Sequence, residues 1–280
     1  MNPEKAIRAE SRTILRNNWV SGIGVFFILF ASVLLALFVF SVIGLLMEIS
    51  FTALFGYLET ISPAYSLTSD TSFGSVVYSN ISSFSMSFLM LAGFVFVFMV
   101  YCGVKRYFYM LSNGEKPGVH EVFYYLAKGR KKRALGFAMG YGFLSFLKLL
   151  LCEAVAIVIA VYSASHDLSG FYLLNETLLV TSIIFAFGGF ALWLLWTSKH
   201  FLSFYLFNEN ENLSVRECKN QSARILRGNL GNSTNKLIFS FAGWFLLALT
   251  GVGMLYFVPY FETASATSAK WILKLDKEVH

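Results

Sequence analysis

Long apolar stretches alternate with short charged stretches along the chain. Four stretches contain no charged residue: 17–47, 71–104, 177–198 and 237–261. A fifth, 134–162, is interrupted only by Lys148 and Glu153. A helix needs about 20 mainly apolar residues to cross the roughly 30 Å of hydrocarbon in a bilayer. With their polar ends trimmed, these stretches predict five spans: 20–46, 84–104, 134–162, 177–198 and 237–257.

The composition agrees with this pattern. Hydrophobic residues make up 56% of the chain and charged residues 14%, whereas soluble domains carry about 25% charged residues. The fold class that follows is all-α: a polytopic transmembrane helical bundle, one domain over 1–280, with about five spans and an amphipathic helix at each end. The first apolar stretch is too long for a cleavable signal peptide and lacks a cleavage site, so we expect it to remain as a span.

The basic residues predict the orientation. Of 22 Lys and Arg residues, 18 lie in the segments 1–19, 105–133 and 199–236, whereas the loops 48–83 and 163–176 carry only acids. Basic loops remain in the cytoplasm, which predicts a cytoplasmic N-terminus in a plasma membrane. The net charge of +6 is explained by this alternation, so no nucleic-acid partner is expected.

Short helices are predicted outside the spans. The basic stretch 4–17 has one apolar side and is expected to rest on the inner leaflet. The stretch 261–275 is expected to lie along the outer surface, with Trp271, Ile272 and Leu273 toward lipid. Ser214 and Glu217 have capping-box spacing and predict a helix that ends near Gly228. The cytoplasmic segments resemble each other, each with aromatics, a turn and a short helix near Val119 or Val215, which suggests two diverged hairpins.

Lys148 and Glu153 are the candidates for an intramembrane polar site. A charge near the centre of a membrane helix costs about 2.5–3.5 kcal/mol, so such residues usually face a cavity or a partner. A step of five residues turns a helix by about 140° net, which disfavours direct pairing. One interpretation is a site inside the bundle for an ion or a polar headgroup. The other is a tilted helix from which Lys148 extends toward the inner surface.

A basic run at the start of the third span is a candidate contact for anionic lipid. It comprises Arg130, Lys131, Lys132 and Arg133. Each basic side chain near an anionic membrane surface contributes about 1 kcal/mol. The alternative is that the run only orients the protein. Nearby, Gly136, Gly140 and Gly142 are expected to let two helices approach closely.

No pattern of catalytic or metal-binding residues is evident. The three cysteines, Cys102, Cys152 and Cys218, lack ligand spacing and are expected to be reduced structural thiols. The four histidines are scattered, and no nucleotide-binding or hydrolase motif occurs in a fitting context. We therefore expect no enzyme activity, no metal and no cofactor.

The C-terminal third resembles a bacterial membrane-protein family, domain of unknown function 975. The residues that carry the resemblance are Ser222, Gly228, Phe239, Ser240, Phe241, Gly243, Trp244, Leu247, Thr250, Gly251, Pro259 and Tyr260. The stretch Gly114–Pro117 followed by Phe123, and Asn18-Trp19 after the basic helix, are also similar to the family. Two departures stand out: the proline-glycine break of the family's fourth span is absent, and so is the aromatic pair near Ser268. The resemblance implies a bacterial cytoplasmic membrane and no particular activity.

Five of these residues predict a packing motif. Phe241, Gly243 and Trp244 are expected to pack together, with Gly243 admitting a neighbour and Trp244 filling the adjacent volume. Pro259 is expected to end the fifth span at the outer surface, where Tyr260 anchors its ring.

Two functions remain open. The first is a non-enzymatic membrane protein that binds lipids or a partner membrane protein, or forms a homo-oligomer. The second is a small transporter or transporter subunit, with Lys148 and Glu153 lining a polar path.

Overall fold

A computed structural model describes residues 3–61, 73–127, 129–165, 172–227, 234, 236–238, 240–241, 243–244 and 250–279. These residues contain helices and no strand, which confirms the all-α fold class. The elements are α1 (Pro3–Arg16), α2 (Trp19–Ile61), α3 (Phe73–Ser112), η2 (Val119–Leu126), α4 (Lys131–Phe137), η3 (Ala138–Phe143), α5 (Leu144–Ser165), α6 (Tyr172–Ser198), α7 (Ser203–Glu209), α8 (Val215–Ile225) and α11 (Val252–Val279). Among them, η2 is a 3₁₀ helix and η3 a π-helix.

Four stretches of helix are long and apolar enough to cross a membrane. They are Trp19–Ile61, Val77–Ser112, Lys131–Tyr162 and Glu176–Glu209, and they confirm an α-helical membrane protein. The stretch 237–250 makes up most of the expected fifth span, and only scattered residues of it are described. The fifth span therefore stays a prediction. Much of the predicted loop 48–83 is helical, because α2 continues to Ile61 and α3 starts at Phe73. Residues 62–72 lie outside the described part.

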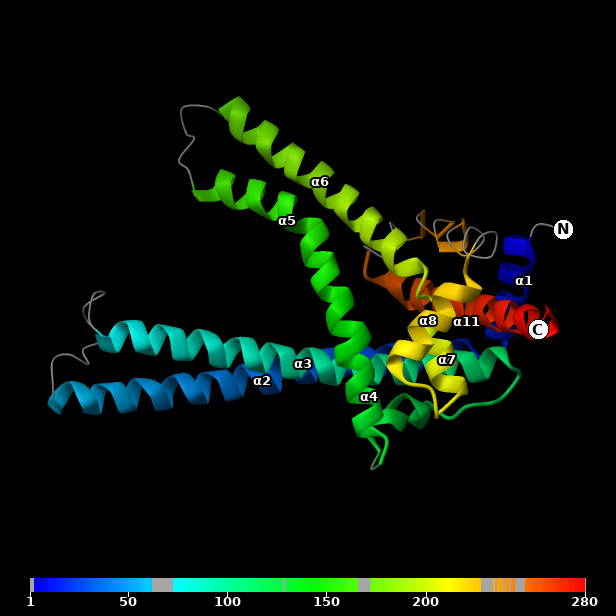
Figure 1. The fold of residues 1–280 in the computed structure, drawn as a ribbon, viewed down its shortest axis with the longest axis horizontal. Helices are drawn as coiled ribbons and strands as arrows, with labels where there is room; N and C mark the ends of the chain where they lie inside the picture. The colour runs from blue at the N-terminus through cyan, green and yellow to red at the C-terminus, as the bar shows by residue number, and fades with distance from the viewer. Residues whose placement is uncertain are drawn as a thin grey trace.

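Two helical hairpins extend from a common packed region (Figure 1). One is formed by α2 and α3, the other by α5 and α6, and the two point away from that region in different directions. We call the packed region the hub. It contains α1, η2, α4, α7, α8 and α11 with the last turns of α3 (residues 3–16, 99–137, 202–226 and 252–279). The described parts of the three basic segments meet in the hub, so they share one end of the four candidate spans.

Aromatic side chains form the core of the hub. Tyr107, Tyr125, Phe137, Tyr205 and Phe207 are each at most 2% exposed. The rings of Phe137 and Phe207 stack with centroids 4.3 Å apart. These residues come from segments separated by as much as 100 positions, and packing them together fixes the ends of α3 and α4 against α7. Cys102 and Cys218 lie in the same core, and all three cysteines are free.

A glycine allows the 3₁₀ helix η2 to pack closely on α3. A Cβ on Gly103 would lie 1.9 Å from the carbonyl oxygen of Val122, so only glycine admits η2 at this distance. The short helix expected near Val119 is therefore present, but in the 3₁₀ form. The capping box at the start of α8 is confirmed: Glu217 accepts from the Ser214 N–H at 2.7 Å, and Ser214 Oγ accepts from the Glu217 N–H at 3.3 Å. Hydrogen bonds from the side chain and backbone of Ser214 lower the pKa of Glu217.

The C-terminal helix α11 lies inside the hub, not along an outer surface. All eight residues from Glu262 to Ala269 are buried, and the seven after Glu262 have small side chains that let neighbouring helices approach closely. Ile272 and Leu273 are each 5% exposed and belong to the hub core, so the prediction that they face lipid is wrong. Trp271 is partly exposed and donates to Glu10 at 2.7 Å.

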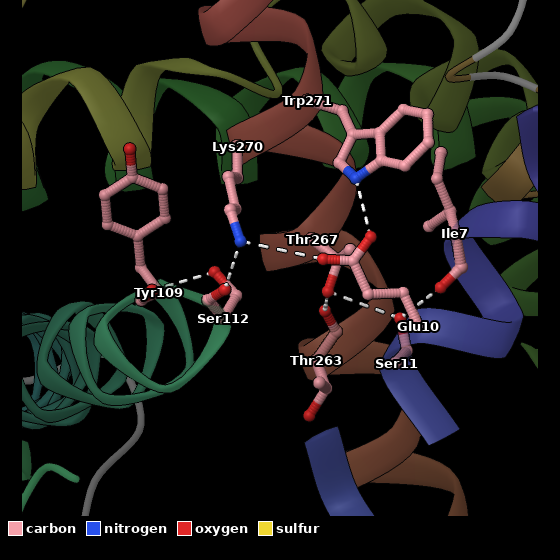
Figure 2. A network of polar contacts seen from close by, with 9 residues as sticks. All are labelled: Ile7, Glu10, Ser11, Tyr109, Ser112, Thr263, Thr267, Lys270 and Trp271. Carbon is pink, nitrogen blue, oxygen red and sulfur yellow. Dashed lines mark hydrogen bonds and ion pairs between the residues drawn. The ribbon is translucent and has the colours of Figure 1, made fainter. Parts of the chain in front are cut away.

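Polar contacts join α11 to α1 and to the end of α3 (Figure 2). Lys270 donates to the Ser112 carbonyl at 2.8 Å and lies 3.6 Å from Glu10. Ser11 donates to Thr267 at 3.3 Å. Because α1 packs on α11, its apolar residues Ile7 and Leu15 are buried by protein. The expectation that this apolar side rests on a leaflet is therefore wrong.

A buried ion pair lies at the junction of α3 and α11. Lys105 Nζ lies 2.7 Å from Glu262 Oε2, and the two side chains are 7% and 6% exposed. Tyr101 donates to Glu262 Oε1 at 3.3 Å. The rings of Tyr101, Phe204 and Tyr205 surround the ammonium group at 5.3–5.9 Å. The pattern identified Lys105 only as a basic residue at the end of a span; its buried partner comes from 157 positions further along the chain.

Candidate functional site

The candidate Lys148 lies nearer the basic end of the bundle than expected. Its ammonium group lies 5.0 Å from the ring centroid of Trp196, and α6 ends two residues later at Ser198. The start of the predicted third span packs in the hub instead of facing lipid, since Ala134 and Phe137 are fully buried there. Lys148 is thus close to the level at which the hairpin joins the hub, not midway across a bilayer.

Three basic side chains surround a small pocket at this junction. Lys148 on α5, His200 just after α6 and Lys219 on α8 line it, together with Tyr141, Leu144, Ser145 and Thr197. We call it the junction pocket. Its lining contains no carboxylate. The positive charges of the two lysines are therefore not neutralised within the pocket, and hydroxyl groups stand beside them.

The π-helix η3 forms one wall of the junction pocket. Its Gly140 carbonyl accepts a hydrogen bond from Lys219 Nζ at 3.3 Å, and Tyr141 donates to the His200 carbonyl at 3.4 Å. Single π-turns inside α-helices occur frequently at functional sites. Gly142 in η3 is needed for close packing, as expected, because an added Cβ would lie 2.6 Å from the Phe98 ring. Gly136 is not, since an added Cβ would contact nothing within 4 Å.

One residue that lines the junction pocket has an unsatisfied nitrogen. His200 Nδ1 is buried and has no hydrogen-bond partner in the described part of the chain. A buried polar atom without a partner costs about 1–3 kcal/mol, so a bound group or water is favoured there. The enclosed volume is only about 10 Å³, enough for one water molecule or one ligand oxygen. A larger anion would place one oxygen inside the pocket and its bulk at the mouth, beside the lysines.

Glu153 does not join this site. Its carboxylate lies toward α6, where an added Cβ at Gly189 would be 3.1 Å from Oε1. No ion pair links Glu153 to Lys148 in the described structure. The two charges both face α6 but at different levels, in keeping with the five-residue step between them.

The four residues of the basic run at the start of α4 have two different kinds of surroundings. Arg130 stacks on the Tyr124 ring at 3.8 Å, and Arg133 stacks on Phe207 at 4.1 Å and donates to its carbonyl at 2.8 Å. Lys131 and Lys132 are exposed. Two members of the run are therefore held by hub aromatics, and only the two lysines are free to meet a membrane surface.

The packing motif is present but is built differently from the expectation. Phe241 is buried against Tyr260 with ring centroids 5.2 Å apart. An added Cβ on Gly243 would contact no described atom within 4 Å, and Trp244 is 37% exposed, so neither fills a tight space. Pro259 lies inside α11 and does not end a helix.

Tyr260 is also placed differently from the expectation. It is buried at 4% exposure, not anchored at an outer surface, and its hydroxyl accepts from Arg12 at 3.3 Å. Pro259 and Tyr260 thus serve the contact between α1, α2 and α11, where Gly22 brings α2 close to the proline ring.

Sequence reasoning identified Lys148 but missed His200 and Lys219 as its neighbours. Lys219 was assigned only to a capped polar helix and His200 to a scattered set. The contact between Lys219 and Gly140 spans 79 positions, and no local pattern reveals such a pairing.

Comparison with known proteins gives one match. A sequence model of a family described as "Protein of unknown function (DUF975)" matches residues 1–275. No curated protein and no solved structure matches the chain.

Proposed function

The chain belongs to the DUF975 family, whose function is unknown, and from that premise we propose that it is a non-enzymatic lipid-binding protein of the bacterial cytoplasmic membrane. In this proposal the hub faces the cytoplasm and the junction pocket binds the phosphate of an anionic lipid in the inner leaflet. One observation carries the proposal: Lys148, His200 and Lys219 surround a pocket without a carboxylate, beside a buried nitrogen that lacks a partner.

The chemistry of the pocket favours a phosphate group. Lysines bind phosphate as point charges, while a hydroxyl group such as that of Ser145 donates a hydrogen bond to one of its oxygens. A phosphate oxygen can accept from a protonated Nδ1 of His200. The position at the end of α6 supports a headgroup ligand, because the pocket then lies at the height of the lipid phosphates.

The transporter alternative has no comparable support. It requires a polar path lined by Lys148 and Glu153, and these side chains lie at different levels of α6 without an ion pair.

Native mass spectrometry of the detergent-purified protein tests the proposal. The wild type is expected to retain phosphatidylglycerol in preference to phosphatidylcholine of the same chain length. Combining Lys148→Ala with Lys219→Ala is expected to weaken that retention about 10- to 30-fold, since each basic group contributes about 1 kcal/mol.

Two control variants test whether the loss of phosphatidylglycerol retention arises at the junction pocket. Lys274→Ala removes an exposed basic residue of α11 and is expected to change nothing. Lys131→Ala with Lys132→Ala removes two exposed lysines at the same end of the bundle. If this second pair abolishes retention and the pocket pair does not, the junction pocket is not the lipid site.

A further inference from the structure

A continuous groove runs between α2 and α3, far from the junction pocket. Two hollows of about 330 and 350 Å³ lie between these helices and share Ser41, Met86 and Leu89. Because they share lining residues, the two hollows are adjacent along the hairpin. We call them together the hairpin groove.

The half of the hairpin groove nearer the hub is apolar. Val33, Leu37 and Phe40 of α2 face Met90, Gly93 and Val97 of α3 across it. The stretch from Val33 to Ser41 covers about 12 Å along the helix axis, comparable with the length of several methylene groups. Leu37 and Met90 are exposed, at 62% and 65%, so this half is open to the surrounding lipid.

The other half, which we call the polar half, adds polar side chains and a single charge to an apolar lining. Ser41, Ser82 and Ser85 line it with Glu48, and no basic side chain is among its lining residues. The three hydroxyls make no hydrogen bond within the part of the chain that the structure describes. By contrast, Ser32, Ser50 and Ser87 each donate to a carbonyl of their own helix, the usual arrangement for serine in an apolar helix.

The order of the two halves matches the membrane. Glu48 ends the uncharged stretch 17–47, so the polar half lies where α2 leaves the hydrocarbon. Since α2 runs from the hub to the tip of the hairpin (Figure 1) and ends at Ile61, Glu48 belongs to the part of α2 nearer the tip. The apolar half continues from there toward the bilayer centre. A lipid in the leaflet opposite the hub has this same order, with its headgroup outward and its chains inward.

We propose that the hairpin groove binds one phospholipid of the leaflet opposite the hub, with a headgroup that carries a primary ammonium. Glu48 accepts hydrogen bonds from the ammonium group, and the three serine hydroxyls donate to the phosphate and ester oxygens. One acyl chain lies along Leu37, Phe40 and Gly93. This site lies at the other end of the bundle from the junction pocket and selects the opposite charge, so it is independent of the proposed function.

Native mass spectrometry of the full-length protein tests the site with two lipids of identical chains. Phosphatidylethanolamine carries the ammonium and phosphatidylglycerol does not. With Lys148→Ala and Lys219→Ala present, so that the junction pocket retains no phosphatidylglycerol, we expect the protein to retain phosphatidylethanolamine about tenfold more strongly than phosphatidylglycerol. Glu48→Gln is expected to remove the preference, whereas Glu176→Gln, which removes an exposed acid from α6, leaves it intact. In that background, equal retention of the two lipids, or equal effects of Glu48→Gln and Glu176→Gln, would overturn the proposal.

A second pair of variants tests the chain-binding half. Leu37→Trp fills the groove with a larger side chain, whereas Leu35→Trp adds the same ring at a lipid-exposed position of α2 outside the lining. We expect the first variant to lose the bound phosphatidylethanolamine and the second to retain it; retention by both contradicts the site. Lys148→Ala with Lys219→Ala leaves this binding unchanged, which separates failure here from failure of the junction pocket.

Discussion

The hub and the two hairpins place the same kinds of side chain in opposite surroundings. In the hub, rings such as Phe137 and Tyr107 are fully buried. Along the hairpins, rings such as Phe38 and Phe187 are 69% and 72% exposed. Both regions are rich in phenylalanine and leucine, so composition does not distinguish them. The difference is the medium that each region meets, water at the hub surface and lipid along the hairpins.

This difference predicts different sources of stability. Burial of apolar surface from water contributes about 25 cal/mol per Å², which favours a core such as that of the hub. Lipid tails are as apolar as leucine, so the hairpins depend on close backbone approach and on hydrogen bonds between helices. Trp193 donates to the Ser145 carbonyl across α5 and α6 at 2.9 Å, and a Cβ on Gly189 would lie 2.6 Å from the Cys152 carbonyl oxygen.

The comparison is tested most strongly by removing one ring from each region. Phe137→Ala leaves a cavity in the hub core and is expected to lower the free energy of unfolding by about 3–5 kcal/mol. Phe187→Ala removes a ring that faces lipid and is expected to change it by less than about 0.5 kcal/mol. Denaturant titration of both variants in the same detergent measures the two values. Similar losses would mean that the hairpin is also stabilised by a packed core.

Breaking the buried ion pair of the hub is expected to cause the next largest loss in the free energy of unfolding. Glu262→Gln leaves the Lys105 ammonium buried without its counter-charge, and we expect a loss of about 3 kcal/mol in the free energy of unfolding. The same titration measures it. Replacing both residues by methionine removes both charges together and is expected to be nearly neutral. A double variant as unstable as Glu262→Gln would show that packing, not charge, is the cause.

The sequence predicted the features that depend on neighbouring residues. The spans follow from uncharged stretches, the helix at Val215 from the capping box of Ser214, and the shared end of the basic segments from their alternation. The hub was not predicted, because its contacts join segments far apart in the chain. The helix α11 shows the reason: Trp271, Ile272 and Leu273 are apolar enough to suggest a lipid contact, but the small residues before them bring the helix into a protein core.

The candidate site was predicted only in part, for the same physical reason. A charge in an apolar stretch is costly wherever it lies, so Lys148 was identifiable. Its depth depends on where the hub ends and the hairpin begins, and this is set by the burial of Phe137 and its neighbours. The serine hydroxyls of the hairpin groove were also unidentifiable, because whether a serine bonds to its own helix depends on its local surroundings.

The smallest expected effect is a difference in the free energy of unfolding between alanine substitutions at two adjacent glycines of α6. Gly189→Ala would place a methyl group 2.6 Å from the Cys152 carbonyl oxygen, so α5 and α6 must move apart, at an expected cost of about 1–2 kcal/mol. Gly188→Ala points into open space and is expected to be neutral or to stabilise the helix by up to about 1 kcal/mol. Unfolding in detergent distinguishes the two, and identical results would contradict a tight α5–α6 interface. Because neither change alters burial from water, a difference between them measures backbone approach alone, the contribution on which the hairpins depend.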